Sequence, residues 1–458
     1  MGGVAQRGTA RTPTGSWARA ALPYLLSLPA LIVTIGILIP FFTAVSYSLQ
    51  RYNLAMPMMR GFVWFDQYLG VLGDAAFWNT VKVSLLYTVL VVVSPHAGGV
   101  GADFRIGVWA PVRGLLAGYN PYAADPAYLQ QYGVAFPASF HPPWLLLVLA
   151  PAALLPFPAG LALVVVLSVA ASWTAAVLVV PPADRRDLVG CVALGLLLTL
   201  TWPGTSDARL GQVAWLAVLG LALVMRSRRG WHGTAGVALI TVHPTFAVPF
   251  SLLVAAAGRT RAVLRGWALC IALSVPVLLL ATHAAGGVGP LLDAVLAGLR
   301  DPEAHGLANR VDLVGRLAGG SLAWTVIALL ATVTIAVVAH RRRVEYGPLV
   351  LLWAVAWSLV LFYAQPYDLG LLVLASFPVV WRAPRWRLLE WALVASYAVL
   401  LLQSDHIDYL LVSTTSVDPQ RLLEVKAAVD LVVLLVVLAL TTARLRRGSD
   451  VRASVAAV

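Results

Sequence analysis

Residues 159–180 read AGLALVVVLSVAASWTAAVLVV, a run without a single charged side chain. About 20 apolar residues in a helix span the hydrocarbon core of a bilayer, so this run is long enough to cross a membrane. Comparable apolar runs precede and follow it, at roughly 20–45, 79–95, 188–203, 210–225, 234–257, 266–283, 321–340, 346–364, 367–381, 388–403 and 427–443. This repetition predicts an all-α, polytopic transmembrane protein with about 11–13 membrane helices, short or broken ones included.

The composition excludes a soluble globular enzyme. Of the 458 residues, 60% are hydrophobic and only 11% are charged, whereas soluble domains carry roughly 25% charged residues. So few charges cannot cover the surface of a soluble molecule of this size. The bias toward Ala, Val, Leu and Arg is typical of a GC-rich bacterial genome, which predicts a place in the bacterial cytoplasmic membrane.

The net charge of +12 suggests nucleic acid until the positions of the basic residues are considered. They form short clusters between the apolar runs: Arg226, Arg228 and Arg229; Arg259, Arg261 and Arg265; Arg341 to Arg343; Arg382, Arg385 and Arg387; Arg444, Arg446 and Arg447. Clusters of this kind mark cytoplasmic loops that face anionic lipid. We therefore expect membrane lipid as a partner and no nucleic acid.

These clusters also assign sides. With them in the cytoplasm, residues 204–211, 284–320 and 404–426 lie outside, and 234–257 begins and ends inside as a broken hairpin with its apex near His243-Pro244. The side of the loop 96–142 stays open. A cytoplasmic N-terminus followed by two spans places residue 96 inside, whereas a re-entrant segment at 143–157 places the loop outside.

Metal and cofactor motifs are missing from the sequence. Cys191 and Cys270 lie within apolar runs and have no partner motif, so we expect neither a disulfide nor a zinc site. Acidic residues and His305 in the loop 284–320 are spaced too loosely for a metal site. No glycine-rich nucleotide loop and no nucleophile elbow is present. The sequence therefore predicts no metal and no cofactor.

The N-terminal segment resembles one family. Residues 19–93 are similar to the start of a sugar ABC transporter permease, a likeness carried by Ala21 to Leu26, Ser46 to Leu49, Phe65 to Tyr68 and Phe77 to Val81. Such permeases contact their ATPase through a loop with Glu-Ala-Ala followed by a glycine. None of the four glutamates of this chain precedes two alanines. A fused or truncated permease subunit is therefore kept as the alternative function.

The rest of the chain, from about residue 102 to 458, resembles glycosyltransferase family 87. The likeness rests on an ordered set of pieces: Asp103-Phe104, Leu115 to Tyr122, Phe140 to Pro143, Gly211-Gln212, His243-Pro244 and Pro366 to Asp368. The resemblance implies a GT-C membrane enzyme that moves a mannose- or pentose-like sugar from a polyprenyl-phosphate donor to a cell-envelope glycolipid or polysaccharide, with inversion, outside the cytoplasm. His141 replaces an aromatic residue and His243 a lysine of the family pattern, which leaves a catalytically inactive scaffold as a third possibility.

The resemblance places the family's catalytic aspartate at Asp103, where a carboxylate would take the proton of the acceptor hydroxyl. If 103–116 is helical, Asp103 shares a face with Gly107, Ala110 and Gly114, and these small residues would leave room for a substrate. The apolar side chains Phe104, Val108 and Leu115 would then lie on the bilayer interface. The alternative is that Asp103 merely caps this helix.

Three further candidates lie between residues 105 and 141. Arg105 and Arg113 would grip a phosphate through two hydrogen bonds each, unless they only reach toward lipid headgroups. Tyr122, in a turn, would stack on a sugar or hold the turn. His141 would donate to the substrate or lie at the membrane interface.

The remaining candidates follow residue 200. Arg209 and Gln212 would hold phosphate or sugar hydroxyls, or Arg209 would form a surface ion pair with Asp207. His243 would face the donor phosphate, or bond a carbonyl freed by Pro244. Asp368 would bind sugar or cap a helix.

The sequence thus predicts three parts. Residues 1–95 form a permease-like transmembrane segment, 96–447 form the glycosyltransferase core, and 448–458 form a disordered cytoplasmic tail.

Overall fold

The computed structural model describes Thr43 and residues 45–51, 61–80, 100–134, 141–226, 230–300, 322–342, 344, 347–362, 364–403 and 418–456. The chain divides into two units, Met1–Leu90 and Val91–Val458. In the first unit, β1 (Gln50–Arg51) pairs antiparallel with β2 (Gly61–Phe62), and α2 (Asp66–Gly73) follows. The predicted spans 20–45 and 79–95 fall almost wholly outside the described residues.

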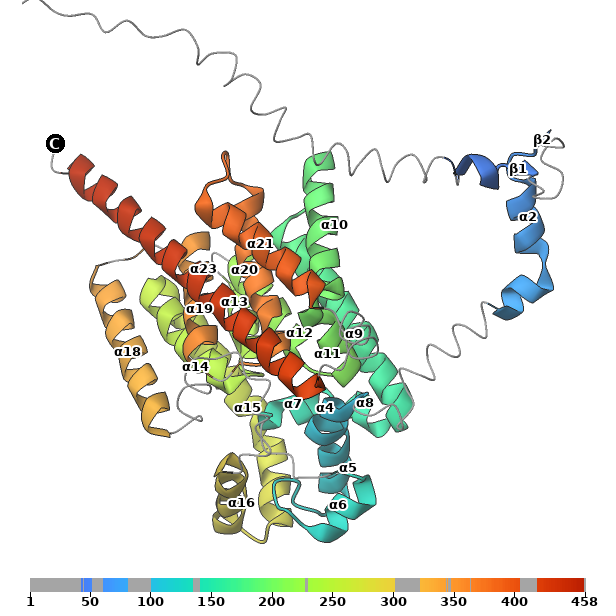
Figure 1. The fold of residues 1–458 in the computed structure, drawn as a ribbon. Helices are drawn as coiled ribbons and strands as arrows, with labels where there is room; N and C mark the ends of the chain where they lie inside the picture. Colours follow the sequence, from blue (N-terminus) through green and yellow to red (C-terminus); the bar gives the residue numbers. More distant parts are fainter. Residues whose placement is uncertain are drawn as a thin grey trace, which may run out of the picture. The chain divides into compact units, whose positions relative to one another are not determined.

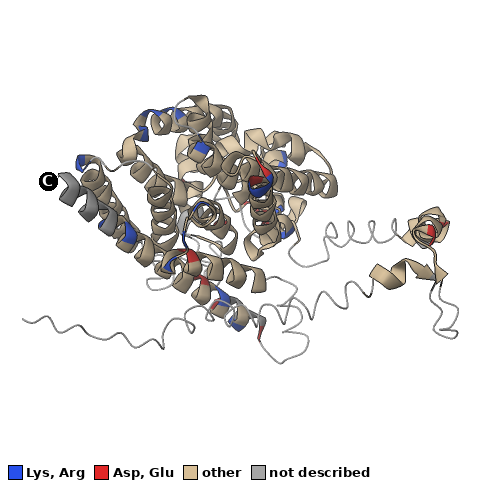
Figure 2. Cartoon of the chain, turned by 90° about the horizontal axis from the view of Figure 1, so that it is seen from above, with Lys and Arg blue, Asp and Glu red and all other residues tan. Residues whose placement is uncertain are grey.

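The second unit is helical, and it confirms the predicted class of fold (Figure 1). Among its described residues, four helical segments are long and apolar enough to cross a membrane: Phe157–Val179, Pro244–Ala284, Ala323–Arg341 and Glu424–Arg446. A fifth crossing is formed if α10 (Arg185–Leu200) and α11 (Trp202–Leu210), which are bent by 53° at Thr201, act as one broken span. Figure 2 shows how few charged residues the helices carry. The protein is therefore a multi-pass membrane protein.

The segment Pro244–Ala284 is not one straight helix. It comprises α14 (Pro244–Val254), the π-helical turn η3 (Ala255–Arg259) and α15 (Thr260–Ala284). Gly258 has a φ of +92°, a left-handed conformation that favours glycine and interrupts the helix beside Arg259. The interruption lies where the arginine cluster predicts a cytoplasmic turn.

Shorter apolar helices form the centre of the unit. They are α12 (Ala214–Arg226), α13 (Trp231–Ile240), α19 (Pro348–Leu361), α20 (Leu369–Trp381) and α21 (Leu388–Leu402). The backbones of α12 and α13 touch, because a Cβ added at Gly220 would lie 2.6 Å from the carbonyl oxygen of Gly236. Small residues that let helices approach this closely are typical of membrane bundles. Two of the long candidate spans correspond to α9 (Phe157–Val179) and α18 (Leu322–Arg341).

Several stretches predicted as loops contain helices. The predicted loop 96–142 contains α4 (Ala102–Phe104), the π-helix η2 (Arg105–Trp109), α5 (Ala110–Leu116) and α6 (Pro126–Tyr132). The short apolar piece that follows, at 143–157, contains α7 (Pro143–Val148) and α8 (Ala150–Leu154). α16 (Val288–Arg300) lies in the predicted loop 284–320, and α23 (Pro419–Ala456) continues into the predicted tail. Polar residues and prolines in these stretches break long apolar runs without preventing short helices.

The unit has two distinct ends. At one end Arg186 donates to the carbonyl oxygen of Trp381, and Arg444 pairs with Glu390 at the start of α21. At the other end of α21, the carbonyl oxygen of Gln403 accepts a hydrogen bond from the buried Lys426 of α23. The Lys426 ammonium also lies 3.8 Å from the ring centre of Trp202, the first residue of α11. Arginine-rich termini therefore gather at the end opposite to α11.

Candidate active site at the α4–α11 contact

Asp103 is held against the end of α11. The backbone N–H of Gly101 donates to the carbonyl oxygen of Arg209 at 2.8 Å, and the side-chain amide of Gln212 donates to Oδ2 of Asp103 at 2.7 Å. Gln212 is itself oriented, because its amide oxygen accepts from the backbone N–H of Val213. Gly101, not Asp103, occupies the N-cap position of α4, and no side chain caps this end. The carboxylate of Asp103 therefore faces Gln212 rather than its own helix.

The electrostatics of Asp103 suit a proton acceptor. Burial raises the pKa of its carboxyl to about 6, although the hydrogen bond from Gln212 and the positive charge of Arg209 oppose the rise. A group with this pKa is mostly ionised at neutral pH and binds a proton more readily than an ordinary aspartate.

A glycine makes the contact between α4 and α11 possible. Gly211 follows α11 with a φ of +65°, and a Cβ added there would lie 2.8 Å from Cβ of Phe104. Any larger residue would push α4 away from Gln212 and strain the turn. Gly211 thus allows α4 to approach α11 closely, and Gln212 donates a hydrogen bond to the Asp103 carboxylate.

The helix after Asp103 forms as predicted, but its small residues leave no room for a substrate. A Cβ added at Gly107 would lie 2.3 Å from Cδ2 of His141, and one added at Gly114 would lie 2.6 Å from a ring carbon of Tyr128. Ala110 is fully buried. The small face is therefore filled by aromatic side chains and His141.

The apolar face of this helix does not lie on the bilayer interface either. Phe104 and Val108 are fully buried and Leu115 nearly so, all within the main hydrophobic core. The helix is therefore packed on both sides.

His141, His243 and Asp368 form the second part of the site. Nε2 of His243 lies 3.5 Å from Oδ1 of Asp368, and the His243 ring centre lies 6.1 Å from that of Tyr367. His141 interacts electrostatically with His243, and burial together with this neighbour lowers the pKa of the His141 imidazole to about 3. His141 is therefore neutral at physiological pH and presents one N–H donor and one acceptor nitrogen.

The position of Asp368 is compatible with both roles predicted for it, helix capping and sugar binding. Its Oδ2 accepts from the backbone N–H of Gln365 and caps η6 (Pro366–Asp368), while Oδ1 faces His243. His243 ends the non-helical stretch between α13 and α14, where the predicted break occurs. The break thus brings an imidazole next to a carboxylate rather than to a carbonyl oxygen.

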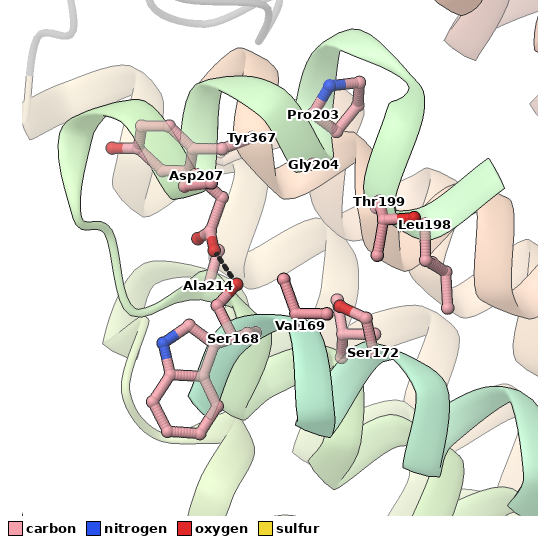
Figure 3. A pocket seen from close by; sticks show the side chains of 14 residues that line it. Ser168, Val169, Ser172, Leu198, Thr199, Pro203, Gly204, Asp207, Ala214 and Tyr367 are labelled. Atoms are coloured by element: carbon pink, nitrogen blue, oxygen red, sulfur yellow. Dashed lines mark hydrogen bonds between the residues drawn. The ribbon is translucent and has the colours of Figure 1, made fainter. Parts of the chain in front are cut away.

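Asp207 is a functional candidate that the sequence analysis undervalued. It is 5% exposed, and its Oδ2 accepts a 2.7 Å hydrogen bond from the hydroxyl of Ser168 on α9 (Figure 3). It does not form the predicted surface ion pair with Arg209, whose charge acts on Asp103. Asp207 also interacts electrostatically with Asp368. The polar sequence around residue 207, between two apolar runs, was the available signal.

Two residues predicted to contact the substrate, Arg105 and Arg113, have other partners. The guanidinium of Arg113 donates to the carbonyl oxygens of Ala153, Leu154 and Leu155 at 2.9 Å and so holds the end of α8. The guanidinium of Arg105 lies 4.2 Å from the ring centre of Phe157.

Tyr122 is 5% exposed, and burial raises the pKa of its phenol to about 12. Its hydroxyl has no hydrogen-bond partner in the described part of the chain. A buried phenol of this kind is not placed to stack on a sugar.

The arrangement thus brings together side chains from five distant parts of the sequence: Asp103, His141, Asp207 to Gln212, His243 and Asp368. It offers a half-buried carboxylate, an exposed arginine and neutral donors at the end of a membrane helix bundle. Over the described residues, no group of three His, Cys, Asp or Glu side chains could hold a metal ion. The chemistry available is proton transfer to a carboxylate with stabilisation of an anion.

Comparison with known proteins identifies one match. The model of glycosyltransferase family 87 matches residues 140–374, which include His141, Arg209, Gln212, His243 and Asp368. No curated protein and no solved structure matches the chain. The permease-like residues 19–93 lie outside the matched range, and that resemblance stays a prediction.

Proposed function

The chain belongs to glycosyltransferase family 87, and we propose that it transfers a sugar from a polyprenyl-phosphate donor to a hydroxyl of a cell-envelope glycolipid or polysaccharide, with Asp103 as the general base. The observation that carries this proposal is the Asp103 carboxylate, held by Gln212 and flanked by Arg209 at the end of a membrane bundle. A donor anchored by a lipid chain can reach such a site from the bilayer.

The reaction needs one proton acceptor and one anion stabiliser. The acceptor hydroxyl oxygen attacks the anomeric carbon as the bond from that carbon to the phosphate oxygen breaks, and the electron pair leaves with the phosphate. The proton of the hydroxyl passes to Asp103, which later releases it to solvent or to the lipid phosphate. Attack opposite to the leaving group inverts the anomeric carbon. General-base assistance of this kind contributes about 10²–10⁴ in rate.

Arg209 is the candidate for the leaving phosphate. Its guanidinium is always charged, and its side chain is exposed at the end of α11 within electrostatic range of Asp103. Anion stabilisation by preorganised donors is commonly the largest part of catalysis. His243, next to Asp368, would add a donor to the same phosphate.

The arrangement of the ends supports an extracytoplasmic site. Arg186, Arg444 and the arginines around Trp381 gather at the end of the bundle opposite to α11. Since arginine-rich ends face the cytoplasm, α11 and Asp103 would face outward in the bacterial cytoplasmic membrane. Polyprenyl-phosphate sugars are suited to that side because they need no soluble nucleotide.

The decisive experiment uses the purified full-length chain in lipid vesicles. Supplied with a radiolabelled mannosyl or arabinosyl polyprenyl phosphate and a glycolipid fraction, the protein should label the glycolipid with an inverted anomer. Supplied with the matching nucleotide sugar, it should not. Transfer from the nucleotide sugar, or retention of configuration, would contradict the proposal.

A further inference from the structure

A pocket beside Asp207 has features that the proposed base chemistry does not use. It is lined by residues of α9, α10, α11, α12, α20 and η6, which include Ser168, Ser172, Asp207, Trp215 and Tyr367 (Figure 3). Two polar atoms in its wall are buried. Nε1 of Trp215 has no hydrogen-bond partner among the described residues, and Oδ1 of Asp207 lies near the backbone N–H groups that begin α12. An unpaired buried donor is unfavourable, so a ligand that accepts from the Trp215 indole would be stabilised here, and the Asp207 carboxylate can accept from the same ligand.

The chemistry of the two atoms selects the ligand. The indole N–H of Trp215 only donates, and the carboxylate oxygen of Asp207 accepts while it is ionised. A hydroxyl group accepts from one and donates to the other. Two hydroxyls on α9, both nearly buried, add further groups: that of Ser168 already donates to Asp207 and can accept, and that of Ser172 can donate or accept. This combination suits adjacent hydroxyls of a sugar ring.

A phosphate does not fit this pocket. Asp207 is within electrostatic range of Asp368, so an anion would meet two carboxyl groups. Residues two apart on a helix project to widely different sides, so Arg209 and Asp207 serve different surfaces of α11. The arginine that suits a phosphate is thus separated from the pocket that suits hydroxyls.

The route into the pocket indicates what the sugar is attached to. Val169 of α9 borders the pocket and is 42% exposed. The apolar side chains of Val166 on α9 and Leu200 on α10 are exposed as well. In a membrane bundle such side chains face lipid tails. A sugar that enters between α9 and α10 therefore does so with an apolar chain remaining in the bilayer.

We propose that the Asp207–Trp215 pocket is a binding site for the sugar headgroup of a lipid-linked substrate, separate from the phosphate contact at Arg209. This inference rests on the proposed function only in naming the lipid as a substrate. Both the donor and the acceptor of the reaction carry this chemistry, and the kinetic measurement below separates them.

Binding is tested first, without turnover. The full-length protein in lipid nanodiscs is titrated with hexyl mannopyranoside and with hexyl phosphate, and empty nanodiscs are subtracted. Trp215→Phe keeps the aromatic ring and removes only the donor, so it should weaken hexyl mannopyranoside binding about tenfold and leave hexyl phosphate binding unchanged. Ser172→Ala should also weaken the binding of hexyl mannopyranoside.

A matched control separates binding from folding. Trp357 donates through Nε1 to the hydroxyl of Thr332, so Trp357→Phe should lower the melting temperature and leave sugar binding unchanged. Trp215→Phe should weaken sugar binding and leave the melting temperature unchanged, because the Trp215 indole N–H has no hydrogen bond to lose among the described residues. Unchanged mannoside affinity in Trp215→Phe, or no binding by the wild type, would overturn the site and leave only water in the pocket.

Kinetics then assign the substrate. Trp215→Phe should raise KM for the donor if the pocket holds the donor sugar, or KM for the acceptor if it holds that sugar. Active transfer with both KM values and the affinity unchanged would overturn the pocket and leave the proposed function intact. Sugar binding at the pocket without any transfer would overturn the proposed function instead.

Discussion

Asp103 shows how one residue obtains the properties of a base from its surroundings. Burial raises its pKa to about 6, while Gln212 and Arg209 keep it from rising further. Because the folded pKa lies above the ordinary value, the ionised carboxylate destabilises the fold. That loss of stability develops as the pH rises from about 4 through 6.

The pH dependence of transfer follows from this pKa. A general base works only when it is deprotonated, so kcat/KM should fall about tenfold for each pH unit below 6 and level off above it. The measurement is initial transfer rate in vesicles from pH 4.5 to 8. A flat profile across pH 6 would show that another group takes the proton.

A substitution at Gly107 tests how tightly the residues around the site are packed. Gly107→Ala would place Cβ 2.3 Å from Cδ2 of His141, so the imidazole or the helix must move. We expect a loss of about 1–3 kcal/mol of stability, measured as a lower melting temperature. Gly289→Ala, where nothing lies within 4 Å of the added Cβ, is the control and should keep the wild-type value. Equal melting temperatures for both variants would mean that His141 is not held against Gly107.

Candidate site residues could be predicted from the sequence where they belong to the family pattern. Their burial and their contacts could not, because these depend on how the helices pack. The ordered set of motifs singles out Asp103, Gln212, His243 and Asp368, but the contacts of Asp103 with Gln212 and of His243 with Asp368 are seen only in the structure. The burial of Asp207 could not be foreseen, because it depends on Ser168, 39 positions earlier on another helix. The filling of Gly107 by His141 likewise depends on a contact that periodicity does not encode.

At the scale of elements, the break between α13 and α14 is the predicted feature with the clearest chemistry. His243 lies at the end of the break and faces Asp368. The sequence allows a helix after Asp103, but it does not predict α6 and α16, because they lie in stretches whose polar residues, glycines and prolines indicate loops.

Substitutions at His243 test whether the break contributes a phosphate contact. His243→Lys introduces the lysine that the family pattern has at this position, keeps a donor opposite Asp368 and should retain transfer. His243→Leu leaves the buried carboxyl without its partner, which costs about 1–3 kcal/mol, and should raise KM for the lipid donor. Steady-state kinetics and melting temperatures of both variants provide the measurement. If Leu leaves donor dependence unchanged and Lys unfolds the protein, His243 has a structural role only.

For the whole molecule, the arrangement of the two ends makes a topology prediction. Cysteines introduced at Ala124, between α5 and α6, and at Ala297 in α16 should react with a membrane-impermeant thiol reagent in intact cells. A cysteine at Arg385, between α20 and α21, should react only after lysis. All three positions lie on exposed segments, and the native Cys191 and Cys270 are buried.

The labelling result bears on the unit Met1–Leu90 as well. Protection of position 124 with labelling of position 297 would mean that the N-terminal spans set the orientation of the α4–α6 region. The proposed extracytoplasmic base would then have no access to an external acceptor.

The most direct test of the account is sugar transfer by Asp103→Asn. Asparagine keeps the size of the side chain and can still accept from Gln212, but it cannot take a proton. We predict a loss of about 10²–10⁴ in transfer rate with an unchanged or higher melting temperature, because a buried charge is removed. Asp293→Asn, on the exposed face of α16, should transfer at the wild-type rate. Transfer by Asp103→Asn within a few-fold of wild type would contradict the account.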